Sequence, residues 1–314
     1  MPTSSVSHFS DPDAYAASIQ PTATEVVVTG RGPFSAKLIS IDFHRLILRR
    51  FSETLPRIIH TAYRGGSVSL QFLIEPGPGL IADGVEYEPG KIVRHIEGAN
   101  YHQVSSGFTR FGGVSLPKED MADIGEAMIA TDLTPPRDTT LATPPPSALE
   151  RLQRLHAAAA HLAETAPEII ANPDAANSLE QMLIDAMVGC LDHAGSDPNT
   201  LAQGQHVVVM KRFRRVLEEH PDQALYIPEI CKAVGVSDNT LRVCCHEHLG
   251  MGPRRYLMLR RMHLARRALR EATKDTTTVT EIATRYGFWH LARFAGEYQS
   301  LFGETPSVTL GQPA

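Results

Sequence analysis

The chain has 314 residues, of which 42% are hydrophobic, and it carries a formal net charge of −5 at pH 7. This length allows two or three domains with separate cores, and no apolar run reaches the roughly 20 residues of a membrane span. Residues 1–13 lack the basic start and apolar stretch of a secretory signal, so the sequence predicts a cytoplasmic protein without membrane contact. Four cysteines, all after residue 189, predict no disulfide framework.

The charge is distributed unevenly along the chain. Residues 205–314 hold 16 Lys+Arg and 11 Asp+Glu, net +5, whereas residues 1–204 hold 14 and 24, net −10. A DNA-binding surface has to neutralise phosphates, which requires local positive charge. The acidic total therefore does not exclude nucleic acid as a partner of the carboxy-terminal part.

In chain order, we expect a flexible N-terminus over residues 1–20 and a β-rich domain over residues 21–140. Short segments with β-branched or aromatic residues, some of them alternating with polar residues, are separated by turns such as Asp83-Gly84 and Pro89-Gly90. Many short strands punctuated in this way are typical of a small barrel. The predicted strands are Glu25–Thr29, Phe34–Ile41, Phe43–Arg50, Arg57–Tyr63, Ser67–Ile74 and Thr109–Leu116.

A proline-rich stretch, residues 134–147, is predicted to be a stiff spacer that continues neither a sheet nor a helix. Residues 148–200 are predicted to be a helical linker with two amphipathic helices, Ala148–Thr165 and Ser178–His193. Their apolar stripes could pack on their own domain or on a second copy, which makes the segment a candidate for dimerisation. Residues 195–204 are expected to form the hinge into the next domain.

Residues 227–306 contain one pattern twice, about 52 residues apart. Each copy has a short apolar stripe, a glycine, and a longer stripe that ends at glycine and proline. Glycine adopts the positive φ that ends a helix, so each copy predicts a helix-turn-helix, at 227–249 and at 279–302. Ser237 is placed as an N-cap, and Thr278 with Glu281 has the spacing of a capping box.

Between the copies, Pro253 to Arg270 alternates a buried face with arginines. At about 1.5 Å per residue this helix would span roughly 27 Å, near the roughly 34 Å between successive major-groove faces. We expect a rigid, basic connector that sets two reading heads in adjacent grooves. The arginines are Arg254, Arg255, Arg260, Arg261, Arg266, Arg267 and Arg270.

Residues 207–310 resemble the DNA-binding domain of the AraC/XylS family of bacterial transcription regulators. Cys245, where an aromatic residue is usual, and Gly296, a weak helix former, depart from the commonest family form. The resemblance is carried by Tyr256-Leu257, Arg261-Met262, Ala265, Leu269, Glu281-Ile282-Ala283, Tyr286-Gly287-Phe288, Arg293-Phe294 and Phe302-Gly303-Glu304-Thr305-Pro306-Ser307.

The resemblance implies a multidomain α+β fold: a cupin-like β-barrel sensing domain, a helical linker or dimerisation segment, and an all-α domain over residues 205–310 with two helix-turn-helix units. It also implies a sequence-specific transcription regulator, modulated by a small-molecule effector, that binds double-stranded DNA. By analogy it would form a homodimer and activate by contact with RNA polymerase. No cofactor is expected.

The predicted DNA contacts lie at the start of each reading helix. Asparagine suits adenine and arginine suits guanine, because each presents a bidentate edge in the major groove. A solvated side chain or a phosphate contact remains the alternative for each position. The candidates are Ser237, Asp238, Asn239, Arg242 and His246 in the first unit, and Trp289, His290, Ala292 and Arg293 in the second.

Two other readings are open. A metal-dependent, cupin-type enzyme would need clustered ligands, but His44, His60, His95 and His102 form no His-x-His pair. We therefore predict no catalytic residues and no metal, and Cys244 with His248, one helical turn apart, is interpreted as part of a buried face rather than a zinc site. A ligand-independent regulator whose barrel only mediates protein contacts is the third reading.

Overall fold

The computed structural model describes residues 1–19, 22–63, 66–75, 77, 79–95, 100–134, 140–192, 195–196, 205–221, 223–273 and 277–311. Most of the predicted hinge, residues 197–204, lies outside these ranges, as do residues 135–139 of the predicted spacer. Among the described helices, none combines the length and the apolar character that a membrane crossing requires.

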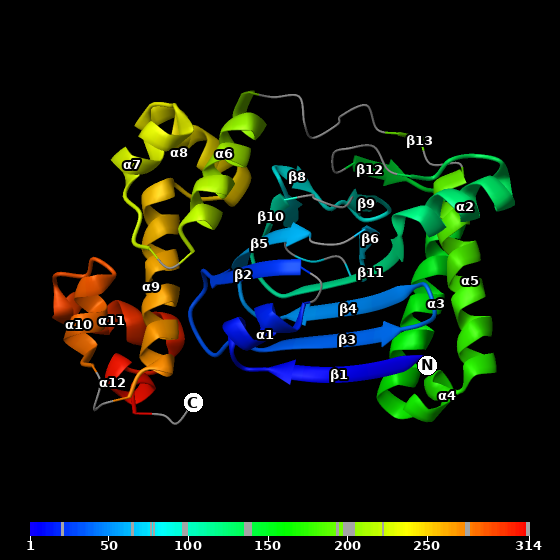
Figure 1. The fold of residues 1–314 in the computed structure, drawn as a ribbon, viewed down its shortest axis with the longest axis horizontal. Helices are drawn as coiled ribbons and strands as arrows, with labels where there is room; N and C mark the ends of the chain where they lie inside the picture. The colour runs from blue at the N-terminus through cyan, green and yellow to red at the C-terminus, as the bar shows by residue number, and fades with distance from the viewer. Residues whose placement is uncertain are drawn as a thin grey trace.

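The amino-terminal part folds into two antiparallel sheets (Figure 1). The large sheet has the order β1-β3-β4-β11-β6-β9-β12-β13 and the small sheet the order β2-β5-β10-β7-β8. The large sheet contains β1 Thr3–Phe9, β3 Ala36–Asp42, β4 Ile47–Glu53, β6 Ser67–Leu73, β9 Ile92–His95, β11 Thr109–Pro117, β12 Thr140–Thr143 and β13 Gly195–Ser196. The small sheet contains β2 Thr22–Val28, β5 Arg57–Tyr63, β7 Leu80–Ala82, β8 Val85–Glu86 and β10 Asn100–Ser105.

Most helices follow the strands in the chain, whereas α1 lies between β1 and β2 and α2 between β11 and β12. The helices cover the sheets from two sides (Figure 1). Those of the amino-terminal part are α1 Pro12–Ser18, α2 Lys118–Ile129, α3 Pro146–Thr165, α4 Pro167–Ala171 and α5 Pro173–Asp192. Those of the carboxy-terminal part are α6 Gln205–Glu219, α7 Ile227–Val234, α8 Asp238–Leu249, α9 Pro253–Glu271, α10 Val279–Arg285, α11 Leu291–Phe302 and α12 Pro306–Thr309.

The two sheets face each other across a shared core. Ile59 and Tyr101 of the small sheet belong to the same buried cluster as Phe51 and Phe111 of the large sheet. The rings of Phe51 and Phe111 stack with centroids 4.6 Å apart. Side chains alternate between the faces of a strand, so the inward residues of both sheets build one interior. The predicted β-rich barrel domain is confirmed.

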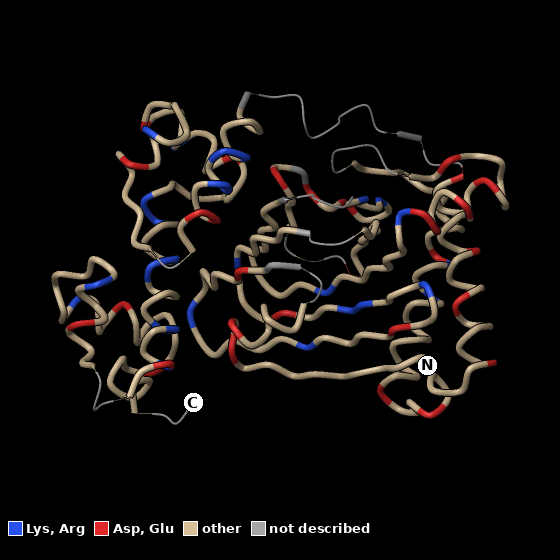
Figure 2. The backbone as a smooth tube through the Cα atoms, viewed as in Figure 1, with Lys and Arg blue, Asp and Glu red and all other residues tan. Residues whose placement is uncertain are grey.

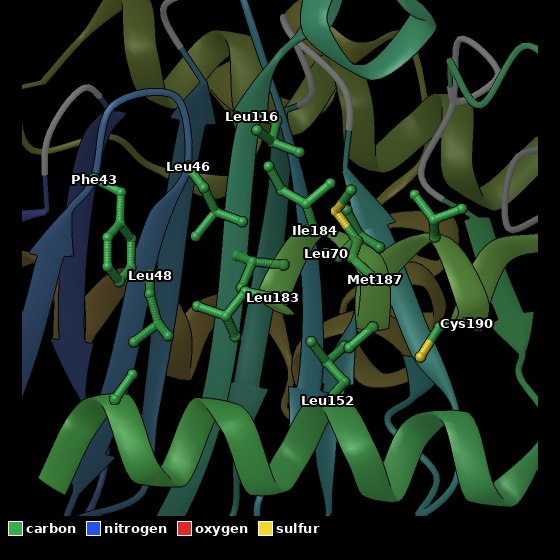
Figure 3. Packing of buried hydrophobic residues seen from close by; sticks show 14 of the residues in the cluster. Phe43, Leu46, Leu48, Leu70, Leu116, Leu152, Leu183, Ile184, Met187 and Cys190 are labelled. Atoms are coloured by element: carbon green, nitrogen blue, oxygen red, sulfur yellow. The ribbon is translucent and has the colours of Figure 1, made fainter. Parts of the chain in front are cut away.

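Helices α3 and α5 cover the outer face of the large sheet. Figure 3 shows Leu152 of α3 and Leu183 of α5 in the same packed cluster as Leu48 and Leu70 of the sheet. All four side chains are fully buried. The apolar stripes that made these helices candidates for dimerisation are therefore used within their own domain.

The outer face of the small sheet carries the carboxy-terminal domain. Helices α6 and α8 contact β10, and α9 contacts β2. Val27 and Ile58, which point outward from the small sheet, share a buried cluster with Phe213 of α6 and Tyr256 of α9. The barrel thus lies between a helical layer and the carboxy-terminal domain (Figure 1).

The prediction of a flexible N-terminus over residues 1–20 is wrong. Residues Thr3–Phe9 pair along their whole length with β3. In the following helix, the fully buried Tyr15 donates a hydrogen bond to Glu53 at 2.6 Å. The polar residues Ser4, Ser5 and Ser7 give this segment a weak strand pattern in the sequence. The strand forms because β3 offers it a partner along the edge of the sheet.

Two further expectations are corrected. Residues 140–143, placed in the spacer, form β12 and pair with β9, because an adjacent strand offers them hydrogen bonds. The strand predicted at Phe43–Arg50 begins at Ile47, since the Phe43 N–H donates to Leu46 O at 3.0 Å and closes the β3–β4 turn. Strands β7 to β10 are missing from the prediction. The first three have only two to four residues, and β10 is mostly polar in sequence, so none shows a clear strand pattern.

Candidate nucleic-acid interface

The first helix-turn-helix unit consists of α7 and α8. Helix α7 ends at Gly235, whose φ of 78° is the left-handed conformation that glycine adopts without strain. Ser237 caps α8, because its Oγ accepts a hydrogen bond from the Thr240 N–H at 3.1 Å. The stripe of Leu241, Cys245 and Leu249 is fully buried, as the pattern predicts.

The second unit consists of α10 and α11 and repeats this design with a longer turn. The Glu281 carboxylate accepts a hydrogen bond from the Thr278 N–H at 2.8 Å, while Thr278 Oγ1 accepts one from the Glu281 N–H at 3.2 Å. The hydrogen bonds from Thr278 and Thr277 lower the pKa of the Glu281 carboxyl below 4.5. Gly287 has a φ of 79° and turns the chain toward α11.

Helix α9 joins the two units, and Arg261 at its middle ties them together. Its guanidinium lies 5.2 Å from the ring centroid of Tyr226, which precedes α7, and 5.3 Å from that of Phe288, in the turn before α11. A Cβ at Gly287 would lie 2.2 Å from Tyr226 Oη and 2.8 Å from Arg261 Nη1. Gly287 thus permits a close approach between the two units that no larger residue would fit.

The predicted contacts of the first unit lie at the exposed start of α8. Arg242 donates a hydrogen bond to the Asn239 side chain at 2.8 Å. Asp238 forms an ion pair at 3.0 Å with Arg254, the second residue of α9. His246 is exposed one turn further along. Ser237 serves as the cap described above, and its side chain is already engaged.

The predicted contacts of the second unit also lie together, at the start of α11. Trp289 is 72% exposed, so its ring is not packed into the turn before α11. His290 occupies the N-cap position without a side-chain cap, and Ala292 is exposed. Arg293 is exposed and pairs with Glu297 at 2.8 Å, one helical turn away, and this contact raises its pKa.

The expected basic, DNA-facing connector is wrong for most of its arginines. Arg260 is buried and pairs with Glu25 of β2 at 3.0 Å, and its guanidinium also donates to Pro221 O at 2.8 Å. Arg266 and Arg270 both pair with Asp11. Figure 2 shows the basic positions of α9 along the side of the barrel. A helix that faces solvent and a helix that faces an acidic neighbour can carry the same pattern of arginines in the sequence. Only the packing of the helix in the structure distinguishes the two cases.

Two residues outside the predicted base contacts join the candidate interface. Arg254, predicted only as part of the basic connector, is 78% exposed in its side chain and lies beside the start of α8. Leu291 is 39% exposed at the first turn of α11, although its spacing matches that of the buried Phe294 and Tyr298. The signal was available for Leu291: it directly follows the cap position, and the first turn of a recognition helix points outward.

The histidines and cysteines considered as metal ligands have other surroundings. Cys244 and His248 are buried on one face of α8. His95 stacks on Tyr101 inside the barrel with centroids 4.1 Å apart, and burial lowers its pKa to about 3. His60 and His102 meet where the barrel contacts the carboxy-terminal domain. Within the described ranges, no three His, Cys, Asp or Glu side chains are grouped to hold a metal ion.

Asp238 at the start of α8 pairs with Arg254 in the first turn of α9, whereas Phe288, before α11, contacts Arg261 at the middle of α9. The exposed starts of α8 and α11 define a double helix-turn-helix domain of the kind that binds DNA. Residues 230–312 match a family model described as a helix-turn-helix domain. The matched region overlaps residues 207–310, which resemble the DNA-binding domain of the AraC/XylS family.

Two curated relatives are similar to about a third of the chain. A probable thc operon regulatory protein of Rhodococcus erythropolis is 45% identical over 94 residues, which cover 30% of this chain and 28% of that protein. A XylDLEGF operon transcriptional activator 2 of Pseudomonas putida is 33% identical over 100 residues, covering 32% of this chain and 64% of that protein. The chain thus spans less than two thirds of the length of these relatives.

Solved structures of similar layout are more distant. The AraC-like transcriptional activator CuxR aligns over 89% of this chain and 99% of its own, with 15% identity and a TM-score of 0.42. ToxT from Vibrio cholerae, solved with a bound unsaturated fatty acid, aligns over 85% of this chain and 95% of its own, with 12% identity and a TM-score of 0.34. Scores this low do not establish a common arrangement of the domains.

Proposed function

We propose that this protein is a transcription regulator that binds double-stranded DNA sequence-specifically through the starts of α8 and α11. The observation that carries the proposal is the pair of exposed recognition-helix starts, one with Asn239 and Arg242 and the other with Arg293, in two units that α9 joins. These side chain types read base edges in the major groove. The curated relatives are named as operon regulators, which supports the same class of function.

The dimensions of the domain support simultaneous contact with two major grooves. Helix α9 has 19 residues, which at about 1.5 Å per residue give a length of about 28 Å. Successive major-groove faces lie about 34 Å apart, which is close to this length. The contact of Arg261 with Tyr226 and Phe288 makes the distance between the units rigid.

A footprint on genomic DNA, followed by changes in spacing, tests this proposal. The footprint should cover two major grooves on one side of the duplex. Inserting 5 base pairs between the two contacted segments turns them to opposite sides, and inserting 10 restores the side but not the distance. If one rigid domain holds both heads, both insertions abolish tight binding. Recovery at 10 base pairs would mean instead that separate subunits hold the two heads, and an absent footprint would refute sequence-specific binding.

We further propose that a small-molecule effector binds in the pocket between the barrel and the carboxy-terminal domain. This pocket has a volume of about 360 Å³ and is lined by Glu25, His60, Leu217, Glu218, Arg260 and Arg267, among others. The void inside the barrel measures about 40 Å³, room for a few water molecules. Sites for small molecules typically measure about 300–1,000 Å³. A ligand held by both domains would favour one of their arrangements, which is the requirement for regulation.

A thermal-shift screen with metabolites tests for the effector, and two variants locate it. A ligand of the interdomain pocket should lose its effect in Arg267→Ala and keep it in Thr61→Val, which alters the barrel void. The opposite result would place the ligand in the barrel. If no metabolite raises the melting temperature, the alternative of a barrel that mediates only protein contacts is favoured.

We infer that the protein acts in the cytoplasm without catalytic activity, as an activator that contacts RNA polymerase by analogy with the relatives. Metal analysis of the purified protein tests the enzyme alternative, because a cupin-type enzyme would retain a stoichiometric metal ion. Sedimentation of the free protein and of its DNA complex tests whether a homodimer forms. The covered stripes of α3 and α5 make these helices an unfavourable dimer contact.

A further inference from the structure

Histidines cluster where the small sheet meets the carboxy-terminal domain. His60 of β5 and His102 of β10 are direct cross-strand partners, with ring centroids 5.1 Å apart. His248 of α8 packs over the β7–β8 turn, where its ring lies 3.3 Å from the Cβ position of Gly84. The small sheet and α8 supply these histidines, and aromatic residues of α6 and α9 pack against His102, so the cluster belongs to the contact between the domains.

His102 is the centre of the cluster and has no polar partner for its ring. Its side chain is fully buried against Phe213 of α6 and Tyr256 of α9, with ring centroids 6.4 and 6.1 Å away. Within the described residues, neither ring nitrogen of His102 makes a hydrogen bond. A neutral imidazole tolerates such an apolar site, whereas an imidazolium would lose its hydration without compensation.

The charged groups around His102 do not favour a proton on it. Arg214 of α6 is 1% exposed and pairs with Asp83. Asp83 also accepts a hydrogen bond from the backbone N–H of His102 at 3.2 Å. Glu218 of α6 pairs with His60 at 3.0 Å. Both carboxylates are thus already engaged.

The remaining titratable groups nearby do not offer a counter-charge either. The Tyr256 phenol is buried, and burial raises its pKa. The carboxylate of Glu247, beside His248 on α8, lies 2.6 Å from Nδ1 of the exposed His206 and pairs with it. A protonated His102 would therefore lie beside the buried Arg214 cation without a free acid.

We propose that this histidine cluster makes the docking of the DNA-binding domain on the small sheet a proton-sensitive contact, closed near neutral pH and released in mildly acidic solution. The proposal stands on the domain contact alone and does not depend on the DNA sequence or the effector.

The direction of the effect follows from linkage. Burial, and then His60, Arg214 and His248, hold the pKa of His102 well below 6.5 in the docked arrangement, and burial also lowers the pKa of His248. A histidine released into water regains its ordinary pKa of about 6.5. Docking is therefore at full strength above this pH. Below it, the docking equilibrium falls by up to tenfold per pH unit for each such histidine, down to the docked pKa.

Small-angle scattering of the full-length chain between pH 8 and pH 5 tests the proposal, with circular dichroism recorded on the same samples. The radius of gyration should rise between about pH 6.5 and pH 5 while the helix and sheet signals persist. An unchanged radius would overturn the proposal. So would an expansion that coincides with the loss of secondary structure, because this would be unfolding of the whole protein.

Variants assign the response to the cluster. His102→Phe keeps an aromatic ring against Phe213 and Tyr256 but cannot be protonated, so its midpoint should move to lower pH. His263 is buried where α9 meets β2, and burial lowers its pKa as well. Its protonation also opposes docking, so a smaller expansion at acidic pH should remain in His102→Phe. His156→Leu, at the α3 contact with the large sheet, is the matched control and should expand at the wild-type pH.

A midpoint in His102→Phe equal to that of the wild type would refute the role of the cluster. If His102→Phe does not fold, His248→Leu and hydrogen exchange of the wild type replace it. The β10 amides from Tyr101 to Ser105 should then exchange faster at pH 5.5 than at pH 7.5, after correction for the intrinsic rate, and unchanged protection would contradict the proposal.

Discussion

The two helix-turn-helix units share a sequence pattern but differ in their neighbours. Helix α8 of the first unit packs against β10 of the barrel, whereas α10 of the second unit packs against α9, and α11 against α10 and α12. The sequence records this difference at equivalent positions. Cys244 is fully buried on α8, while its counterpart Glu297 on α11 is partly exposed and pairs with Arg293.

The comparison shows how a barrel can influence DNA binding. A change at the small sheet reaches the first unit directly, through α6 and α8. It reaches the second unit through α9 and through Arg261, which touches Tyr226 on one side and Phe288 on the other. Regulation can therefore act on the distance and orientation between two reading heads as well as on either head alone.

We expect the largest loss of stability from a substitution at Gly287, where the two units approach each other. Gly287→Ala adds a Cβ at 2.2 Å from Tyr226 Oη on a backbone with a φ of 79°. We expect a loss of about 2–5 kcal/mol in the free energy of unfolding, from strain and overlap together. Gly235→Ala is the matched control in the first unit, since it has the same φ but no atom closer than 3.8 Å, and should cost about 1 kcal/mol. Chemical denaturation measures both, and equal losses would contradict the role of the close approach.

The next effect is a loss of DNA affinity, which compares the predicted base contacts of the two helix-turn-helix units. Arg242→Ala and Arg293→Ala should each weaken binding to a cognate site by about 1–3 kcal/mol and relax the base preference at one position. The affected positions should lie in different major grooves. Binding assays against a set of single-base variants check this. A uniform loss on all sequences would identify that arginine as a phosphate contact.

A smaller effect compares the caps of the two units. Ser237→Ala removes the side chain that accepts from the Thr240 N–H, and Thr278→Ala removes the one that accepts from the Glu281 N–H. Each should cost about 1 kcal/mol of stability. Thermal denaturation at neutral pH measures both, with Thr280→Ala, an exposed position inside α10, as the control. A loss in the control equal to that in Thr278→Ala would argue against a capping role.

The smallest effect tests which arginines of α9 face DNA. Arg254→Ala, at the exposed start of the helix, should lower the slope of log affinity against log salt by about 0.9 and weaken all sequences alike. Arg267→Ala, which pairs with Asp13 at 2.8 Å, should leave that slope unchanged. The reverse result would mean that α9 turns its other side to DNA when the complex forms.

Local patterns predicted the carboxy-terminal domain well because its determinants are local. Helix periodicity, the glycines at 235 and 287 and the capping pair at 278 and 281 act within a few residues of each other, and the structure has the helix bounds that they imply. The barrel was less predictable. Strands such as β1 and β12 depend on partners that lie far away in the chain, so their own residues carry a weak signal.

By itself the sequence determined the two helix-turn-helix units, the helix between them and the strand-rich character of the amino-terminal part, because residues near one another in the chain decide these features. Only the tertiary structure decided that Arg260, Arg266, Arg267 and Arg270 of α9 face acidic residues of the amino-terminal part and that His102 is enclosed between two domains. These features depend on which surface meets which, and burial and ion pairing across such contacts arise between residues separated by a hundred positions or more.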